Sequence, residues 1–306
     1  MLVEEPGSPP RVGRTRAPVN SRLRAKRVEI ITGISQQAAL AIQNHQLQQE
    51  MLVRERLERE MQLAREIQQT FLPDQLPGLP GWQVNVWWRT ARETGGDFYD
   101  LIDLPGNRLG IVIADVADKG LPAALFMTLI RTLVRAAVRE GHPPAEVLEV
   151  VNNLLIPDAR HGTFVTIVYA VLDPATGQLT YANAGHNPPL WVRTSLAQID
   201  LFPRSGMALG VVEDNPVDQR AVTLLPGDFL VLYTDGVTDA FSPQGLPYGF
   251  ERLHQVVSES AFAPPGLLSA GAMMEAIDQS INDFIGDEPA ADDSTGLVFY
   301  FESPGA

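Results

Sequence analysis

The chain has 306 residues, of which 45% are hydrophobic and 20% charged, and its formal net charge is −14 at pH 7. This composition is typical of a folded globular protein of one or two domains. The chain has no cysteine, which excludes disulfides and thiolate metal sites. Its acidity disfavours binding to nucleic-acid phosphates, and no apolar run approaches the roughly 18 residues that cross a bilayer. We therefore expect a cytoplasmic protein that binds neither nucleic acid nor membrane.

Residues 1–27 are rich in Pro, Gly, Ser and Arg and contain few apolar side chains. Such a segment cannot bury enough apolar surface to fold, so we expect a disordered basic tail. A basic arm that contacts nucleic acid or an acidic partner is the less common alternative for this composition.

Residues 28–72 have a helical pattern, with no proline and one glycine, Gly33. Apolar residues at three- and four-residue spacing form one narrow stripe, which consists of Leu57, Met61, Ala64, Ile67 and Phe71. Leu40 and Leu47 are a heptad apart, but Arg54 interrupts that register. A helix this long cannot bury itself with so narrow a stripe. We expect a helical linker that either dimerises as a coiled coil or connects two domains.

Residues 73–306 have the pattern of a second domain that contains strands and helices. Alternating or apolar runs predict strands at 82–90, 97–104, 108–115, 163–172, 178–184, 227–236 and 294–302. Helical periodicity predicts helices at 121–140, 143–155, 249–257 and 273–285. Strands that pair as sequence neighbours, with helices between groups of them, indicate an α+β fold.

The first predicted hairpin brings two carboxylates together. If its loop is 105–107, Leu104 lies opposite Arg108 and Asp97 lies opposite Asp115. Two carboxylates about 4 Å apart repel by roughly 4 kcal/mol at an effective dielectric constant near 20. We therefore expect a cation or a proton between them.

Further aspartates occupy comparable positions at strand ends. Asp235 ends an apolar strand, and Asp292 and Asp293 immediately precede the last strand. If those strands are antiparallel neighbours, all of these acids meet at one edge. Oxygen ligands suit hard cations such as Mg²⁺ or Mn²⁺, and no histidine cluster indicates zinc. Taken singly, each aspartate also fits an ordinary turn residue.

Five segments occur in an order that resembles a known family. They are "GGDFYD" (95–100), "DVADKGLPAALFM" (115–127), "NAGHNPP" (183–189), "LYTDGVTDA" (232–240) and "DDSTGLVFY" (292–300). Together they resemble the SpoIIE/RsbU-like bacterial branch of the metal-dependent PPM protein serine/threonine phosphatases. The segment "AREIQQTFLP" (64–73) is similar to the helix that precedes the domain in that branch. The resemblance extends over about residues 60–302.

The resemblance implies a β-sandwich flanked by helix layers, with a site for two divalent cations, Mn²⁺ or Mg²⁺, at one end. The ligands that it implies are Asp97, Asp115 as the bridging residue, the Val116 carbonyl, Asp235, Asp292 and, with less support, Asp293. Gly96 and Gly236 would then allow the backbone to approach the ions, although both also fit plain turn glycines.

The implied reaction is hydrolysis of phosphoserine or phosphothreonine by a water that the metals activate. His186 would either donate a proton to the leaving oxygen or brace its loop by hydrogen bonds. Arg89 or Arg92 would hold the phosphate. Asp118 stands where the family more often has glycine. It would cap the helix that starts near Leu121 or reach a metal-bound water, with Lys119 offsetting its charge.

The resemblance also implies partners. The substrate is expected to be a phosphorylated anti-sigma-factor antagonist, and residues 27–50 resemble the last helix of a GAF sensor domain. We hypothesise that dimerisation through residues 34–71 controls activity. Two alternatives stay open, namely an inactive module of the same fold that binds the same partner, and a hydrolase of small phosphoesters.

Overall fold

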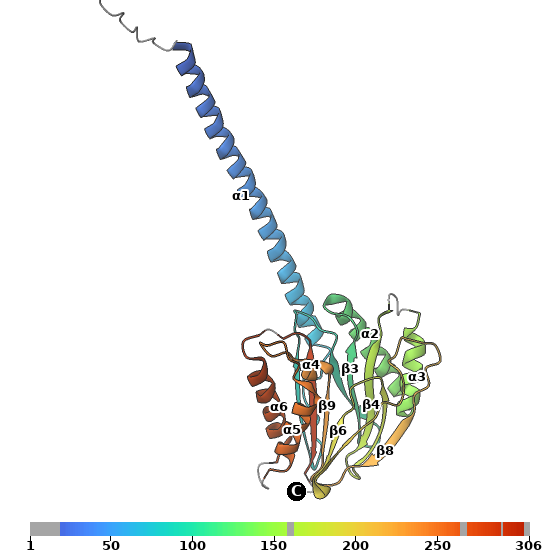
Figure 1. The fold of residues 1–306 in the computed structure, drawn as a ribbon. Coiled ribbons are helices and arrows are strands. Elements are labelled where there is room, and N and C mark those ends of the chain that lie inside the picture. The colour runs from blue at the N-terminus through green and yellow to red at the C-terminus, as the bar shows by residue number, and fades with distance from the viewer. Residues whose placement is uncertain (1–18, 158–161, 264–267, 289, 303–306) are drawn as a thin grey trace, which may run out of the picture. The chain divides into compact units, whose positions relative to one another are not determined.

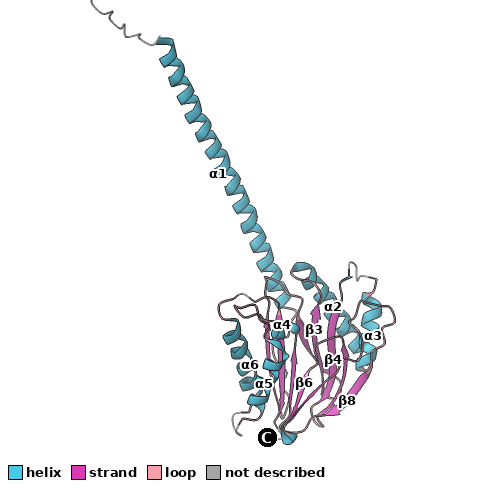
Figure 2. Ribbon diagram, in the orientation of Figure 1, coloured by secondary structure: helices cyan, strands magenta, loops and turns pink. Residues whose placement is uncertain are grey.

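The computed structural model describes residues 19–157, 162–263, 268–288 and 290–302. The chain divides into two compact units, Met1–Arg59 and Glu60–Ala306. All the described strands belong to the second unit, where they lie between layers of helices (Figure 2).

Helix α1 spans Val19–Gln69 and has 51 residues (Figure 1). It begins well before Val28, so the prediction of a disordered tail is wrong for residues 19–27. That stretch contains no proline or glycine and is rich in Arg, Leu, Ala and Lys, which favour helix despite the positive charge. The remainder of the predicted tail, residues 1–18, lies outside the described residues.

Two five-stranded antiparallel sheets form the centre of the second unit. Sheet A has the order β1 (Trp82–Arg89), β10 (Ser294–Phe301), β9 (Phe229–Tyr233), β6 (Leu190–Arg193) and β7 (Gln198–Leu201). Sheet B has the order β2 (Phe98–Leu104), β3 (Arg108–Val116), β4 (Val165–Asp173), β5 (Gln178–Ala184) and β8 (Gln219–Thr223). Strands β6, β7 and β8, which have four or five residues each, were not predicted.

The predicted pairings are confirmed. Leu104 lies opposite Arg108 in the hairpin of β2 and β3, where Gly106 and Asn107 adopt positive φ angles in the turn. Strands β4 and β5 form the second hairpin, and β9 and β10 are antiparallel neighbours. The register of each pair determines which side chains face one another at the strand ends.

Helices cover the outer face of each sheet (Figure 1). Helices α2 (Leu121–Arg139) and α3 (Pro144–Leu155) pack on sheet B, and α5 (Gly249–Ala261) and α6 (Ala270–Ile285) pack on sheet A. A short helix, α4 (Asp235–Thr238), follows β9. Three apolar clusters fill the spaces between these four layers, so the predicted α+β sandwich is confirmed.

Among the described residues, α2 is the one helix long and apolar enough to cross a membrane by length and composition. Its side chains Ala123, Met127, Ile130 and Val134 are buried in the cluster against sheet B. The apolar character of α2 therefore reflects its place in the core, where each large buried side chain contributes roughly 1.5–3 kcal/mol.

Candidate active site

Acidic side chains from both sheets meet at one end of the sandwich. Asp97 precedes β2 and Asp115 lies near the end of β3 in sheet B. Asp235 follows β9, and Asp292 and Asp293 precede β10 in sheet A. The ends of these strands converge, because the Thr234 hydroxyl bonds Asp97 and the Gly96 amide bonds Asp293 between the two sheets.

Asp97 is the most enclosed of these acids, with 2% of its surface exposed. The hydroxyls of Thr234 and Thr295 donate hydrogen bonds to its Oδ2, at 2.6 and 3.2 Å. Trp88 Nε1 donates to its backbone carbonyl at 2.8 Å. Burial, and next the charge of Asp115, raise the pKa of Asp97 well above its ordinary value, against the lowering effect of the Thr234 bond.

Asp115 lies opposite Asp97 in the continued register of β2 and β3, in which Phe98 pairs with Ala114. Burial, followed by the charge of Asp235, raises the pKa of Asp115 to about 7, although its hydrogen bond with Asp97 lowers it. Burial and then Asp292 also raise the pKa of Asp235. Without an added cation, two of these carboxylates can share a bond only by keeping a proton.

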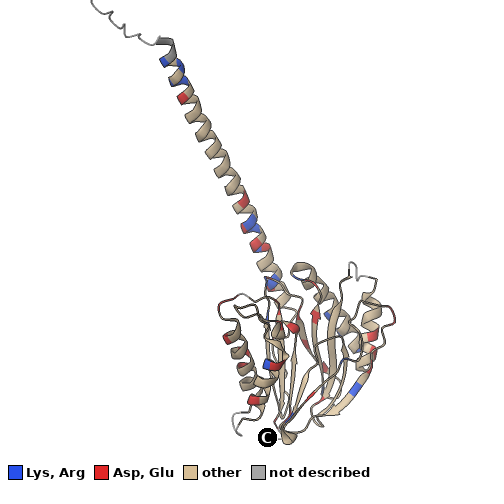
Figure 3. Ribbon diagram, in the orientation of Figure 1, with Lys and Arg blue, Asp and Glu red and all other residues tan. Residues whose placement is uncertain are grey.

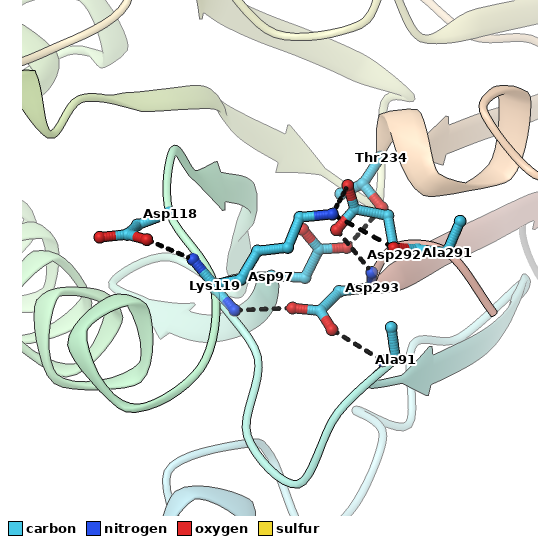
Figure 4. A network of polar contacts seen from close by, with 9 residues as sticks. Ala91, Asp97, Asp118, Lys119, Thr234, Ala291, Asp292 and Asp293 are labelled. Carbon is cyan, nitrogen blue, oxygen red and sulfur yellow. Dashed lines mark hydrogen bonds and ion pairs between the residues drawn. The ribbon is translucent and has the colours of Figure 1, made fainter. Parts of the chain in front are cut away.

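Lys119 supplies a positive charge beside these acids. Its Nζ lies 2.7 Å from Oδ2 of Asp292 and donates to the Ala291 carbonyl at 3.2 Å (Figure 4). The prediction that Lys119 offsets Asp118 is therefore wrong. Asp118 does not cap the helix either, because its Oδ1 accepts from the Lys119 amide at 2.7 Å and the N-cap of α2 is Gly120, without a side-chain cap.

Asp293 connects the loop before β10 to the loop between β1 and β2. Its Oδ1 accepts from the Ala91 amide and its Oδ2 from the Gly96 amide, both at 2.8 Å (Figure 4). A Cβ on Gly236 would overlap the Asp293 carbonyl oxygen, and a Cβ on Gly96 would lie 2.9 Å from the Val116 carbonyl oxygen. Both glycines are thus required by close backbone approach. These contacts favour a bracing role for Asp293.

The donor set fits hard divalent cations. Asp97, Asp115, Asp235 and Asp292 supply oxygen ligands only, and the space beside the Val116 carbonyl is kept open by Gly96. In the described part of the chain, no three His, Cys, Asp or Glu side chains already surround one ion position. Burial, and after it the charges of neighbouring carboxylates, raises the pKa values of Asp97, Asp115 and Asp235, and a divalent cation would offset that negative charge.

Comparison with known proteins identifies the family. The family model described as "Stage II sporulation protein E (SpoIIE)" matches residues 105–302. The chain belongs to the SpoIIE family. Protein IcfG of Synechocystis is 32% identical over 268 residues, which are 79% of this chain and 41% of that protein. The phosphoserine phosphatase RsbU of Bacillus subtilis is 28% identical over 219 residues, 72% of this chain and 63% of RsbU. The chain thus spans less than two thirds of the length of these relatives.

Solved structures agree with the family assignment. The SiaA-PP2C domain of Pseudomonas aeruginosa has a TM-score of 0.71 at 24% identity, covering 81% of this chain and 98% of that domain. The RsbU and RsbW domains of a Mycobacterium tuberculosis protein have a TM-score of 0.63 at 26% identity, covering 77% and 64%. The predicted fold and family are confirmed. The likeness to a GAF domain concerns residues before the family match and stays a prediction.

In this SpoIIE-family chain His186 is buried, with 1% of its surface exposed. Its Nδ1 forms a hydrogen bond of 2.8 Å with the hydroxyl of Thr166, the residue that pairs with Asp115 in sheet B. The His186 amide donates to Asn183 Oδ1, and Arg204 Nε donates to the His186 carbonyl. Burial lowers the pKa of His186 to about 3. These contacts favour the bracing alternative over the proton donor.

The two candidate phosphate-binding arginines differ. Arg89 extends to α6, where Nη1 lies 2.6 Å from Asp278 Oδ1 and 3.3 Å from Asn282 Oδ1. Arg92 lies exposed in the loop that precedes Asp97 and makes no hydrogen bond or ion pair with any described residue. Arg92 is therefore the better candidate for binding phosphate, because its guanidinium donors bond no described residue.

Several contributing residues were missed by the sequence reasoning. Thr234 and Thr295 stand inside the quoted motifs, where a hydroxyl beside an aspartate was the available signal. Gln68, near the end of α1, carries no such signal. Its amide makes two hydrogen bonds with the backbone of Gly95, at 2.5 and 3.1 Å, and so fixes the loop that leads to Asp97.

Proposed function

We propose that this SpoIIE-family chain is a metal-dependent phosphatase that acts on phosphoserine or phosphothreonine in a protein. The observation that carries the proposal is the convergence of Asp97, Asp115, Asp235 and Asp292 at one end of the sandwich, with raised pKa values for the first three. Two relatives, RsbU and RsbP of Bacillus subtilis, are phosphoserine phosphatases, which supports the same activity here.

The proposed cofactors are two divalent cations, Mn²⁺ or Mg²⁺. When bound, they would polarise the phosphoryl group and lower the pKa of a water held between them. A structure of the same fold, RsbX in complex with magnesium, supports a divalent cation, although it is 17% identical with a TM-score of 0.53. In this chain, Asp115 is proposed as the bridging ligand, with the Val116 carbonyl beside it.

The other residues would position these ligands and the substrate. Thr234 and Thr295 both donate to Oδ2 of Asp97, which leaves its Oδ1 free of those hydroxyls. Asp293 would hold the loop of Gly96 in place, and Arg92 would donate to the phosphate. No cysteine nucleophile is required for this reaction, in agreement with a chain that has none.

The proposed substrate is a phosphorylated regulatory protein, specifically an anti-sigma-factor antagonist. The likeness to RsbU supports a regulatory phosphoprotein, and the exposed Arg92 leaves the phosphate-binding position open to a large partner. We propose a cytoplasmic location for this reaction.

We further propose that α1 forms a homodimer that controls activity. Its apolar side chains between Ile30 and Leu47 are 49% to 64% exposed, and no Asp, Glu, Lys or Arg stands between Ile30 and Gln49 (Figure 3). An isolated helix of this kind gains stability by pairing. The bonds between Gln68 and Gly95 would transmit a change in α1 to the loop of Asp97.

The activity is tested with p-nitrophenyl phosphate and a phosphoserine protein in the presence of Mn²⁺. We expect turnover of the phosphoprotein, and a loss of at least about 100-fold in Asp115→Asn, because the amide lacks the negative charge and the second oxygen that the proposed bridging ligand needs. The matched control is Asp74→Asn, at an exposed position outside the acids, which should keep full activity.

The outcomes separate the alternatives. Undiminished turnover in Asp115→Asn would contradict the metal-site assignment. Turnover of p-nitrophenyl phosphate alone would indicate a hydrolase of small phosphoesters, and no turnover of either would indicate an inactive binding module. For the dimer, deletion of residues 1–55 should change both the oligomeric state, measured as the number of chains per particle by sedimentation equilibrium, and the phosphatase rate. If both stayed unchanged, the hypothesis would be refuted.

A further inference from the structure

A cavity lies at the end of sheet B opposite the acids. It has a volume of about 710 Å³ and lies where α2 and α3 meet the sheet. The hairpin end of β2 and β3, with Leu104, Pro105 and Arg108, forms one side, and the connection from Gly141 to Pro144 forms another. Asp97 and Asp115 stand at the opposite ends of these two strands, so the cavity is separate from the proposed phosphatase site.

Positively charged side chains line this cavity, although the formal net charge of the chain is −14 at pH 7. Three arginines line it, Arg108, Arg135 and Arg139, whereas Asp103 is the one acidic lining residue. Arg135 donates two hydrogen bonds to the Asp100 carboxylate, at 2.5 and 2.7 Å, and these hold its guanidinium in place.

The other two arginines retain free donors. Arg108 uses Nε to donate to the Pro105 carbonyl at 3.0 Å, and its two Nη atoms make no hydrogen bond with a described residue. Arg139, in the last turn of α2, has neither a hydrogen bond nor an ion pair with any described residue. His142 also lines the cavity, and its hydrogen bonds with Glu140 and Glu146 raise its pKa.

A tyrosine hydroxyl also opens into the cavity. Tyr169 of β4 is 1% exposed, lines the cavity, and makes no hydrogen bond with any residue that the structure describes. The ring is buried, but its hydroxyl keeps accessible surface in the cavity and is free to bond a water or a bound molecule. The walls beside it are apolar, formed by Ile102, Leu104, Val138 and Val171.

We propose that this cavity binds a small organic phosphate of about mononucleotide size. Its volume lies within the range of roughly 300–1,000 Å³ that is usual for small-molecule sites. Guanidinium groups match phosphate oxygens in geometry and charge, so the phosphate is assigned to Arg108 and Arg139. The apolar body of the ligand lies on Val138 and Val171, and a polar atom of it bonds the Tyr169 hydroxyl.

Calorimetric titration of the full chain tests the proposal, with AMP, ATP, GTP and pyrophosphate as probes. EDTA is present throughout, so that the acids of the other site stay without divalent cations and repel anions. At least one of the nucleotides is expected to bind with a dissociation constant below the millimolar range, and pyrophosphate is expected to bind more weakly.

Three variants locate the binding. Arg139→Gln and Tyr169→Phe should each weaken the nucleotide about tenfold or more, since each removes a bond to the ligand. Neither should unfold the protein, because neither removed group is bonded to a described residue. Arg220→Gln is the matched control, since it removes the same charge from β8 outside the cavity.

Failure of all four probes to bind would overturn the proposal. So would an equal loss in Arg220→Gln, which would indicate general charge attraction, or pyrophosphate binding as tightly as the nucleotides, which would leave the apolar walls without a role. Because Asp115→Asn should leave nucleotide binding unchanged, this experiment is independent of the proposed phosphatase activity.

Discussion

Lys119 Nζ and Asp292 Oδ2 form an ion pair of 2.7 Å that joins the turn between β3 and α2 to the segment before β10 (Figure 4). The pair places an ammonium group beside the acids. Burial and then the charge of Asp292 raise the pKa of Asp235, and the charge of Lys119 opposes this rise. Lys119 therefore engages one carboxylate oxygen of Asp292, a proposed metal ligand.

We predict that Lys119→Met raises the affinity for Mn²⁺, because it removes a positive charge that competes for Asp292. Both side chains are partly exposed, and such pairs contribute about 0–1 kcal/mol, so the increase should be up to about fivefold. Titration followed by the electron paramagnetic resonance of free Mn²⁺ measures it. Lys26→Met, which alters the other lysine of the chain, should change nothing. A weaker affinity in Lys119→Met would show that Lys119 instead holds Asp292 in place for the metal.

Gly236→Ala should destabilise the fold by about 1–3 kcal/mol, because its Cβ would overlap the Asp293 carbonyl oxygen and force the backbone apart. Urea unfolding gives the free energy. The matched control is Gly271→Ala near the start of α6, where the nearest atom would be Asn85 Nδ2 at 3.5 Å. That change should be neutral or stabilising by up to about 1 kcal/mol. Equal stability of the two variants would contradict the close approach.

Arg92→Ala should raise the KM for a phosphoserine peptide about tenfold and leave the melting temperature unchanged, because its guanidinium bonds no described residue. Arg89→Ala should instead affect the stability and not the KM. It removes the ion pair with Asp278 and should lower the stability by up to about 1 kcal/mol while KM stays constant. If Arg89→Ala were the variant that raised KM, the assignment of the phosphate to Arg92 would be wrong.

His186 should remain neutral throughout the physiological pH range. Burial lowers its pKa from 6.5 to about 3, so the neutral ring stabilises the fold fully above pH 6.5. This stabilisation is lost as the pH falls from 6.5 toward 3. The ring carbon shift in NMR spectra should therefore stay constant between pH 8 and 5. His142, whose pKa is raised by Glu140 and Glu146, should titrate over the same range and serves as the control. A His186 titration near pH 6.5 would revive the proton-donor role.

Local patterns in the sequence predict the longer helices, most of the strands and two hairpins, but not the short strands β6, β7 and β8. The loop at 105–107 set the register of β2 and β3, and that register placed Asp97 opposite Asp115. Helix α1 starts at Val19, earlier than the average composition of residues 1–27 predicts, because the prolines and glycines of that segment all precede Val19.

Contacts between distant segments were not predictable in the same way. Lys119 and Asp292 are 173 positions apart in the chain, and Asp293 bonds Gly96 across 197 positions. Nothing near Lys119 in the sequence distinguishes Asp118 from Asp292 as its partner. Only the packing of sheet A on sheet B decides it, and the same packing creates the hydrogen bond of Thr234 with Asp97.

That hydrogen bond has a consequence for how the protein acquires activity. Asp97 precedes a strand of sheet B and Thr234 follows a strand of sheet A, and Thr295 of β10, the last described strand, adds a second hydrogen bond to Asp97. In a refolding chain whose sheet B has formed but whose β10 has not docked, Asp97 would lack the hydrogen-bond partners that sheet A supplies. Recovery of the proposed phosphatase activity should therefore lag behind recovery of secondary structure, because the acids have their full set of contacts only after the two sheets dock.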